Sequence, residues 1–181
     1  MATPELTWKT DRIFARPPTS ADAQVVFENY ASDPDVAKYM IWRPHRDVAE
    51  TLEFLARCER VWMDGSAFPW SLWLRDTAEF VGLLEIRVRG HAVDLGYALS
   101  RRWWRHGLMS EALASVVQWA LAQSDIYRVW ATCDVENLAS ARVLERAGME
   151  REGILRGWLV HPNISETPRD CFCYSIVKTG S

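Results

Sequence analysis

The chain has 181 residues, enough to bury a substantial apolar core in a fold of ordinary domain size. About half of the residues are hydrophobic and about a quarter are charged, which is the composition of a globular protein. With 24 acidic and 21 basic residues the net charge is −3, which argues against a general nucleic-acid binder, whose footprint is a broad basic face.

The amino-terminal stretch MATPELTWKTDRIFARPP lacks the apolar segment of a signal peptide, and no run of about 18 apolar residues follows it. We therefore expect a cytoplasmic protein without a membrane partner. The four cysteines lack metal-ligand spacing, so reduced, buried thiols are expected and no metal site is. These cysteines are Cys58, Cys133, Cys171 and Cys173.

The first third of the chain predicts one strand and three helical segments. DRIFAR, residues 11–16, alternates modestly as a strand does. A helix is expected over about residues 20–30, and Asp33 can cap the short helical turn that follows. Asp47 with Glu50 three residues later resembles a capping box, which opens a helix that extends to about residue 63.

The rest of the chain predicts a strand meander and then alternating helices and strands. The runs FPWSLWLR, EFVGLLEIRVR and AVDLGYALS are strand-like and are separated by short turns. Residues 107–123 carry one apolar stripe at helical spacing. YRVWATCDV is a strand, Asn137 begins a helix that Gly148 closes, and MEREGILRGWLV and CFCYSIVK are the last strands.

The expected order is therefore β-α-α-β-β-β-α-β-α-β-β. It predicts an α+β fold in α/β/α layers, with a mixed, mainly antiparallel central sheet of about six to seven strands and about four helices. No internal repeat, low-complexity tract or linker interrupts the chain, so a single domain over residues 1–181 is expected.

A basic loop connects the strand that ends near Leu99 to the helix that begins at Gly107. The first amides of a helix have no intrahelical partner and carry the positive end of the helix dipole, which suits a phosphate. Gly107 lacks the Cβ that would keep an anion at a distance. The loop thus predicts a diphosphate site, with a solvated arginine-rich surface as the alternative. Its cationic residues are Arg101, Arg102, Arg105 and His106.

Two stretches, WWRHGLMSEAL and CDVENLASARVLERAGMEREG, resemble the GNAT superfamily of acetyl-CoA-dependent N-acetyltransferases. Within it they resemble the branch of the ribosomal-protein N-terminal acetyltransferases RimJ and RimL. The likeness extends over nearly the whole chain and includes ASDPDVAKYM, VGLLEI and DLGYALS. The superfamily signature Gln/Arg-x-x-Gly-x-Gly/Ala reads WRHGLM here, and it departs at both ends in a manner familiar from the RimJ/RimL branch.

The resemblance implies the GNAT acyl-CoA N-acyltransferase fold and acetyl-CoA as the cofactor. Backbone amides of the loop and first helical turn would wrap the pyrophosphate, and Leu99 would hydrogen-bond the pantetheine arm like an added strand. Asn137 would contact the pantetheine or thioester region as well as acting as a plain N-cap. The cofactor-binding residues so implied are Leu99, Arg101, Arg105, His106, Gly107, Leu108, Met109, Ser110 and Asn137.

Two residues are candidates for the chemistry. Many members of the superfamily place a tyrosine where this chain has Leu144, and RimL-like enzymes are thought to use a serine at the position of Ser140. Ser140 is therefore the expected partner of the departing thiolate, with a local backbone hydrogen bond as the alternative. Glu85 is the candidate general base, ahead of Asp94, and a surface salt bridge is the alternative reading of Glu85. An acidic residue that some relatives carry is replaced here by Trp158.

The expected reaction is transfer of an acetyl group to an amine, in particular to the α-amino group of a protein or peptide N-terminus. A small-molecule amine such as an antibiotic, amino acid or polyamine is the alternative acceptor, and a non-catalytic acyl-CoA-binding module is a further alternative. By resemblance Trp42–His45, Phe68, Trp70 and Trp158 would rim the acceptor groove, although core packing explains the tryptophans equally well. The ten tryptophans also make a homodimer possible.

Overall fold

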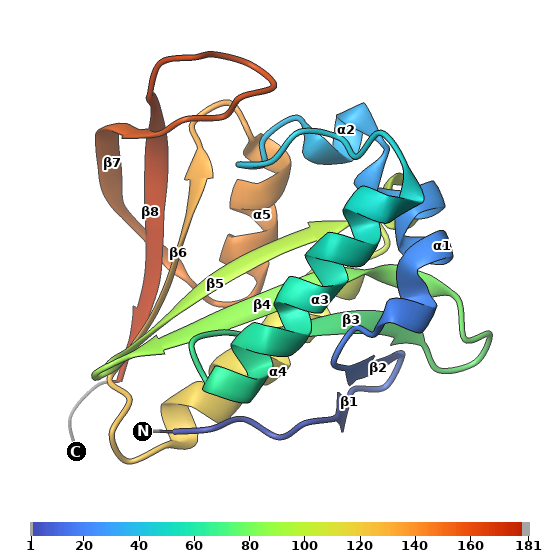
Figure 1. Ribbon diagram of the computed structural model, residues 1–181. Helices are drawn as coiled ribbons and strands as arrows, with labels where there is room; N and C mark the ends of the chain where they lie inside the picture. Colours follow the sequence, from blue (N-terminus) through green and yellow to red (C-terminus); the bar gives the residue numbers. More distant parts are fainter. Residues whose placement is uncertain (1, 179–181) are drawn as a thin grey trace.

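In the computed structural model, which describes residues 2–178, the chain forms one eight-stranded mixed sheet (Figure 1). The order across the sheet is β1-β2-β3-β4-β5-β6-β8-β7. Every neighbouring pair is antiparallel except β5 with β6. The strands are β1 Trp8–Lys9, β2 Ile13–Arg16, β3 Phe68–Leu74, β4 Phe80–Arg89, β5 Ala92–Leu99, β6 Arg128–Asp134, β7 Glu150–Leu159 and β8 Arg169–Val177.

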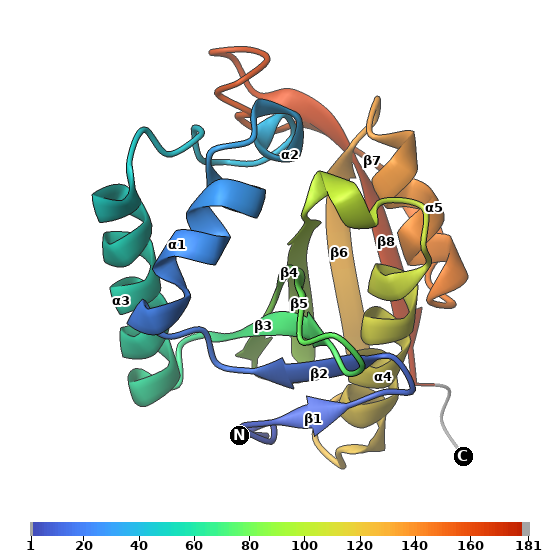
Figure 2. The same ribbon diagram turned by 90° about the vertical axis from the view of Figure 1, so that its right-hand side faces the viewer.

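Helices cover both faces of the sheet, with α1 and α3 on one face and α4 and α5 on the other (Figure 2). This layering confirms the predicted α+β architecture. The sheet has one strand more than expected because the two-residue β1, too short to show alternation, pairs with β2. The helical elements are η1 Ser20–Asp22, α1 Ala23–Val26, η2 Phe27–Ala31, α2 Pro34–Ala37, α3 Val48–Asp64, η3 Arg101–Trp103, α4 Leu108–Ala122 and α5 Leu138–Arg146.

The helix starts follow from side chains that accept backbone hydrogen bonds. Asp33 Oδ1 accepts from the amide of Asp35 at 2.8 Å, and Asp47 Oδ1 accepts from the amide of Glu50 at 3.0 Å. Glu50 Oε2 in turn accepts from the amide of Arg46 at 2.9 Å, one residue earlier than in a capping box. Both predicted caps are therefore confirmed, with this shift in the reciprocal bond.

The larger hydrophobic core lies between the sheet and α4, where alternate residues of β4 such as Leu84 and Ile86 meet the apolar stripe of α4. A smaller core lies on the opposite face, where Tyr30 packs near Leu83 and Ala98. Because both faces of β4 and β5 are covered, these two strands form the rigid centre of the molecule. Among residues 2–178, no helix is long and apolar enough to cross a membrane.

Candidate active site

The sheet opens between its two parallel strands. Residues 92–94 of β5 pair with residues 128–130 of β6, and within the described chain no pairing joins the rest of the two strands. They diverge toward Leu99 and Asp134 (Figure 1). Because every residue of β5 pairs with β4 on its other side, an extended ligand can add to β5 only along the side that faces this opening.

Helix α4 begins next to the open end of β5. Its N-cap, Gly107, has φ +76°, and Arg105 has φ +67°. The first helical hydrogen bond runs from the amide of Glu111 to the carbonyl of Gly107 at 3.1 Å, so the three preceding helical amides have no acceptor within the helix. Leu108 and Met109 are 3% and 1% exposed, so their side chains belong to the core. This arrangement fits an anion held by main-chain nitrogens.

The cations of the loop are used unequally. Arg101 pairs with Asp35 at 2.7 Å and with Asp33 at 3.3 Å, and Arg102 pairs with Glu79 at 2.6 Å. The side chains of Arg105 and His106 are exposed and make no ion pair or hydrogen bond with residues 2–178. Of the four predicted cationic residues, Arg105 and His106 are therefore the two whose side chains remain available to bind a phosphate.

Arg12, which the sequence did not single out, lies against the same helix start. Its Nη1 donates to the carbonyl of His106 at 3.0 Å, and its Nη2 forms an ion pair with Glu111 at 2.6 Å. A Cβ on Gly107 would lie 3.6 Å from Arg12 Nη2. The contact joins residues about a hundred positions apart, and no local pattern in the strand 11–16 marks it.

Helix α5 brings Ser140 to the opening. Asn137 caps the helix by accepting the amide of Ser140 on Oδ1 at 3.1 Å, which confirms its predicted N-cap role. The Oγ of Ser140 lies 2.8 Å from the Oη of Tyr97, a residue of β5 beyond its last pairing with β6. Leu144 is completely buried in the core. Ser140 and Tyr97, the latter missed by the sequence analysis, thus meet where the two strands have separated.

Glu85 lies on the opposite face of the sheet from α4, as alternation along β4 requires. Its Oε1 accepts from Arg87 Nη1 at 2.5 Å, and Arg87 Nε also donates to Asp94 at 2.6 Å. Both candidate carboxylates therefore share one guanidinium. This arrangement agrees with the alternative interpretation of Glu85 as a salt-bridge residue. Its role as a general base stays a prediction.

The tip of β6 is fixed by a buried carboxylate. Asp134 accepts from Arg169 Nε at 2.6 Å and from the amide of Glu136 at 2.9 Å, and His161 Nε2 lies 3.6 Å from its Oδ2. Burial by itself would raise the pKa of Asp134, but the hydrogen bonds from Arg169 and Glu136 outweigh it and lower the pKa. Within residues 2–178, no group of three His, Cys, Asp or Glu side chains is placed to hold a metal ion.

The aromatic residues expected around the acceptor groove separate into two groups. Phe68 and Trp70 are 2% and 1% exposed, so their predicted place on the rim is wrong: they are residues of the larger core, in register with Ile86 and Leu84. Trp42 and His45 do line a hollow of about 350 Å³. Tyr30 from η2 and several residues of α3 form the rest of its lining. Trp158 is exposed on β7, the edge strand of the sheet.

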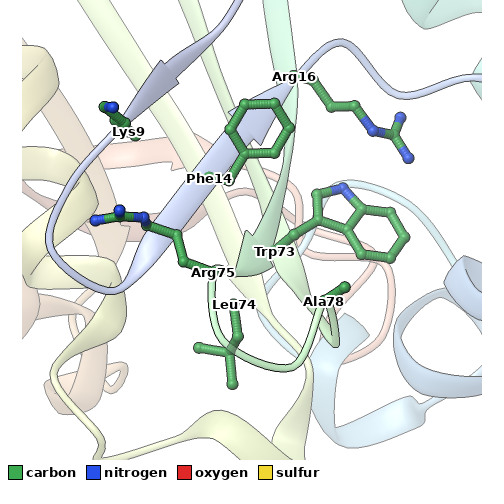
Figure 3. Close-up of a pocket in the computed structure, with 7 residues that line it drawn as sticks. All are labelled: Lys9, Phe14, Arg16, Trp73, Leu74, Arg75 and Ala78. Atoms are coloured by element: carbon green, nitrogen blue, oxygen red, sulfur yellow. The ribbon is translucent and has the colours of Figure 1, made fainter.

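A second hollow, of about 510 Å³, lies at the other edge of the sheet (Figure 3). The side chains that line it come from β1–β3 and the turn after β3, and none is a predicted site residue. They are Lys9, Phe14, Arg16, Trp73, Leu74, Arg75 and Ala78. The hollow is therefore separate from the opening between β5 and β6.

A sheet that opens beside a helix start with unpaired amides can hold a ligand that has both an extended chain and a phosphate. Residues 12–150 match the acetyltransferase (GNAT) domain family, and the chain therefore belongs to the GNAT acetyltransferases. This confirms the resemblance inferred from the sequence and the prediction that the protein is an acetyltransferase.

Curated and solved relatives agree with this assignment. The chain is 30% identical to the [ribosomal protein uS5]-alanine N-acetyltransferase of Escherichia coli, over 87% of this chain and 84% of that protein. A GNAT acetyltransferase from Bacillus anthracis has a TM-score of 0.81 at 26% identity, over 95% and 98% of the two chains.

The fold is also that of RimL, the ribosomal L7/L12 alpha-N-protein acetyltransferase, solved in complex with coenzyme A. It has a TM-score of 0.79 at 19% identity, over 93% of this chain and 95% of RimL. The match to the acetyltransferase (GNAT) domain family bears out acetyl-CoA as the predicted cofactor.

Proposed function

We propose that this enzyme transfers the acetyl group of acetyl-CoA to the α-amino group of a protein or peptide N-terminus. The observation that carries the proposal is the coincidence of three features at one place. The β5–β6 pair opens, α4 starts with free amides beside a left-handed Gly107, and Ser140 lies at the same opening. The identity to an enzyme that acetylates an alanine of a ribosomal protein supports an N-terminal acceptor.

The coenzyme is held mainly by backbone groups in this proposal. The amides from Arg105 to Ser110 bind the pyrophosphate, and the exposed side chains of Arg105 and His106 add charge-assisted hydrogen bonds. Arg101 contributes through its place in the loop, because its guanidinium is engaged by Asp33 and Asp35. The free side of β5 as far as Leu99 pairs with the pantetheine arm, and Asn137 lies next to the thioester region.

In the reaction, the protein stabilises the negative charge on the departing sulfur and accepts the proton that the amine loses. The amine attacks the thioester carbonyl, the C–N bond forms and the C–S bond breaks with its electron pair left on sulfur. Ser140 donates a hydrogen bond to that sulfur. Glu85, the candidate base of the sequence analysis, is assigned to the amine's proton, which it would accept through water.

An α-amino acceptor makes a modest demand on the general base. An N-terminal amine has a pKa near 8 and a lysine amine one near 10.4, so deprotonation at pH 7 costs about 1 kcal/mol and about 4–5 kcal/mol respectively. Of the two amines, the α-amine therefore asks less of any general base.

The test is release of free coenzyme A thiol from acetyl-CoA across a panel of amines. The panel contains peptides with free N-termini beginning with Ala or Ser, the same peptides with blocked N-termini and one internal lysine, and small amines including polyamines. We expect the highest kcat/KM with free N-termini and none above background with blocked ones. A preference for small amines would contradict the proposed acceptor, and acetyl-CoA binding without thiol release for any amine would contradict the reaction.

Location and assembly complete the proposal. Four reduced cysteines suit the cytoplasm, where ribosomal proteins and nascent peptides supply N-termini. A homodimer would use the edge strand β7, on which Ile154 is 54% and Trp158 is 48% exposed. Sedimentation of the purified protein measures that state directly.

A further inference from the structure

The contact between Tyr97 and Ser140 bridges the two walls of the opening. Tyr97 belongs to β5 and Ser140 to the first turn of α5, and they are 43 positions apart in the chain. The Oη of Tyr97 lies 2.8 Å from Ser140 Oγ and 3.2 Å from the carbonyl oxygen of Ser140. The amide of Ser140 donates to Asn137 Oδ1, so the backbone of the serine is fixed on that side as well.

Either hydroxyl can donate in the contact between Tyr97 Oη and Ser140 Oγ, and the two directions leave the Ser140 proton in different places. A tyrosine hydroxyl has one proton to donate, and the nearer of its two possible acceptors is Ser140 Oγ. Burial raises the pKa of Tyr97, an effect that the hydrogen bond to Ser140 opposes only in part, so Tyr97 keeps its proton throughout the physiological range. When Tyr97 donates to Ser140 Oγ, the proton of Ser140 must point to a different acceptor.

A sulfur atom already lies beside that serine. Burial raises the pKa of the Cys133 thiol to about 12, and a hydrogen bond from Ser140 opposes this rise. Cys133 is on β6, the strand on the far side of the opening from Tyr97. The effect of Ser140 on the Cys133 thiol indicates that a sulfur on the β6 side can interact with the Ser140 hydroxyl.

We propose that Tyr97 is a positioning residue for thiol release: it donates to Ser140 Oγ and thereby turns the Ser140 proton toward the departing sulfur. The inference rests on the proposed function, in which Ser140 is the partner of the coenzyme thiolate. No proton has to leave Ser140, because the electron pair of the broken C–S bond stays on sulfur and the free thiolate takes its proton from water.

The first test removes the Tyr97 hydroxyl and keeps the ring. In Tyr97→Phe we expect kcat with acetyl-CoA and a free N-terminal peptide to fall about tenfold, because Ser140 then loses the orientation of its hydrogen bond to the charged thiolate. The Kd for acetyl-CoA, measured by calorimetry, stays within about twofold. Tyr174→Phe is the matched control: it removes another hydroxyl from the same core, one that donates to Glu145 at 2.9 Å, and it should keep wild-type kcat.

A double-mutant cycle separates positioning from packing. Because Tyr97 acts through Ser140, adding Tyr97→Phe to Ser140→Ala should lower kcat no further. An equal loss in both backgrounds, or wild-type kcat in Tyr97→Phe, would overturn the role of Tyr97 while Ser140 keeps its own. Wild-type kcat in Ser140→Ala would overturn both roles. Absence of thiol release from the wild-type enzyme with every amine is the separate result that overturns the proposed function and this inference with it.

Discussion

Strand β5 has two different neighbours. On one side it pairs with β4 through eight residue pairs, from Ala92 with Arg89 to Leu99 with Gly82. On the other side it pairs with β6 through three, and then the two strands separate. One side is a complete antiparallel ladder, and the other exposes backbone donors and acceptors inside the protein.

The difference teaches where the protein can admit a ligand. Unpaired backbone groups in a folded protein need partners, and a ligand with amides of its own can supply them. The proposed coenzyme-binding segments and Ser140 gather at the unpaired side, with the start of α4 at its mouth and Ser140 along it. At the complete side, Gly82 packs so closely that a Cβ would lie 2.4 Å from the carbonyl oxygen of Ala98.

Strand β8, the outer neighbour of β6, holds β6 in place and so maintains the opening. All seven residues of β6 pair with β8, and Arg169 at the start of β8 binds Asp134 at the tip of β6. Strand β5 is likewise held by β4. Each wall is thus anchored to its outer neighbour, and no side chain needs to act as a wedge.

The largest expected effect is at the mouth of the opening. Gly107→Glu places a side chain at φ +76° and a carboxylate beside the proposed diphosphate. Like-charge contact costs several kcal/mol, so we expect the Kd for acetyl-CoA to rise at least about a hundredfold. Calorimetry gives the Kd, and far-UV circular dichroism checks the fold.

A matched variant separates backbone strain from charge. Gly90 also has a left-handed φ of +59°, lies in the turn at the closed end of β5 and has open space around it. Gly90→Glu should therefore carry the strain and leave acetyl-CoA affinity unchanged. Equal affinities in the two variants would contradict the assignment of the mouth to the diphosphate.

The next effect concerns the outer anchor of β6. Arg169→Met leaves the buried Asp134 without its main partner, and removal of one member of a buried pair costs about 3 kcal/mol of unfolding free energy. Urea unfolding measures the loss, and the exposed Arg156→Met on β7 is the control. Hydrogen exchange should quicken at residues 131–134 and stay constant in β4. A uniform change across the sheet would show that β6 is not separately anchored.

The smallest effect is at the closed end of the β5–β6 pair, where Arg128 of β6 pairs with Glu152. The hydrogen bonds from Arg128 and Ser175 lower the pKa of Glu152 from its ordinary 4.5 to about 2. Because the folded-state pKa is the lower one, this pair adds stability above pH 4.5 and loses it as the pH falls toward 2.

The variant Glu152→Gln tests this predicted loss of stability at low pH. At pH 7 the variant should lose less than about 1 kcal/mol of unfolding free energy, because the pair is exposed to solvent. At pH 3 the difference between variant and wild type should shrink. A difference that is the same at both pH values, measured by urea unfolding, would mean that the carboxylate contributes by packing and not by charge.

Much of the fold could be predicted because its signals are local. The caps Asp33, Asp47 and Asn137 and the closing glycine Gly148 all act within a few residues of themselves. The long strands show in their apolar runs for the same reason. The two-residue β1 could not be seen, since a strand of that length has no periodicity and depends on its pairing with β2.

The sequence predicted those parts of the site that lie within one continuous stretch of the chain. The α4 start and the Asn137–Ser140 turn are each one stretch of sequence. The neutralisation of Arg101 by Asp33 and Asp35, and the contact of Tyr97 with Ser140, join segments that are far apart. No pattern along a single sequence reports which acids will meet an arginine loop, so the engaged and the available cations looked alike.

The most direct test of the central claim is a crystal structure of the protein with acetyl-CoA. The account predicts the pyrophosphate on the amides of residues 105–110 and the pantetheine arm along the free side of β5, with its sulfur within hydrogen-bonding distance of Ser140 Oγ. Coenzyme bound elsewhere, for example in the hollow beside β1–β3, with the β5–β6 opening filled by the protein's own side chains, would contradict it.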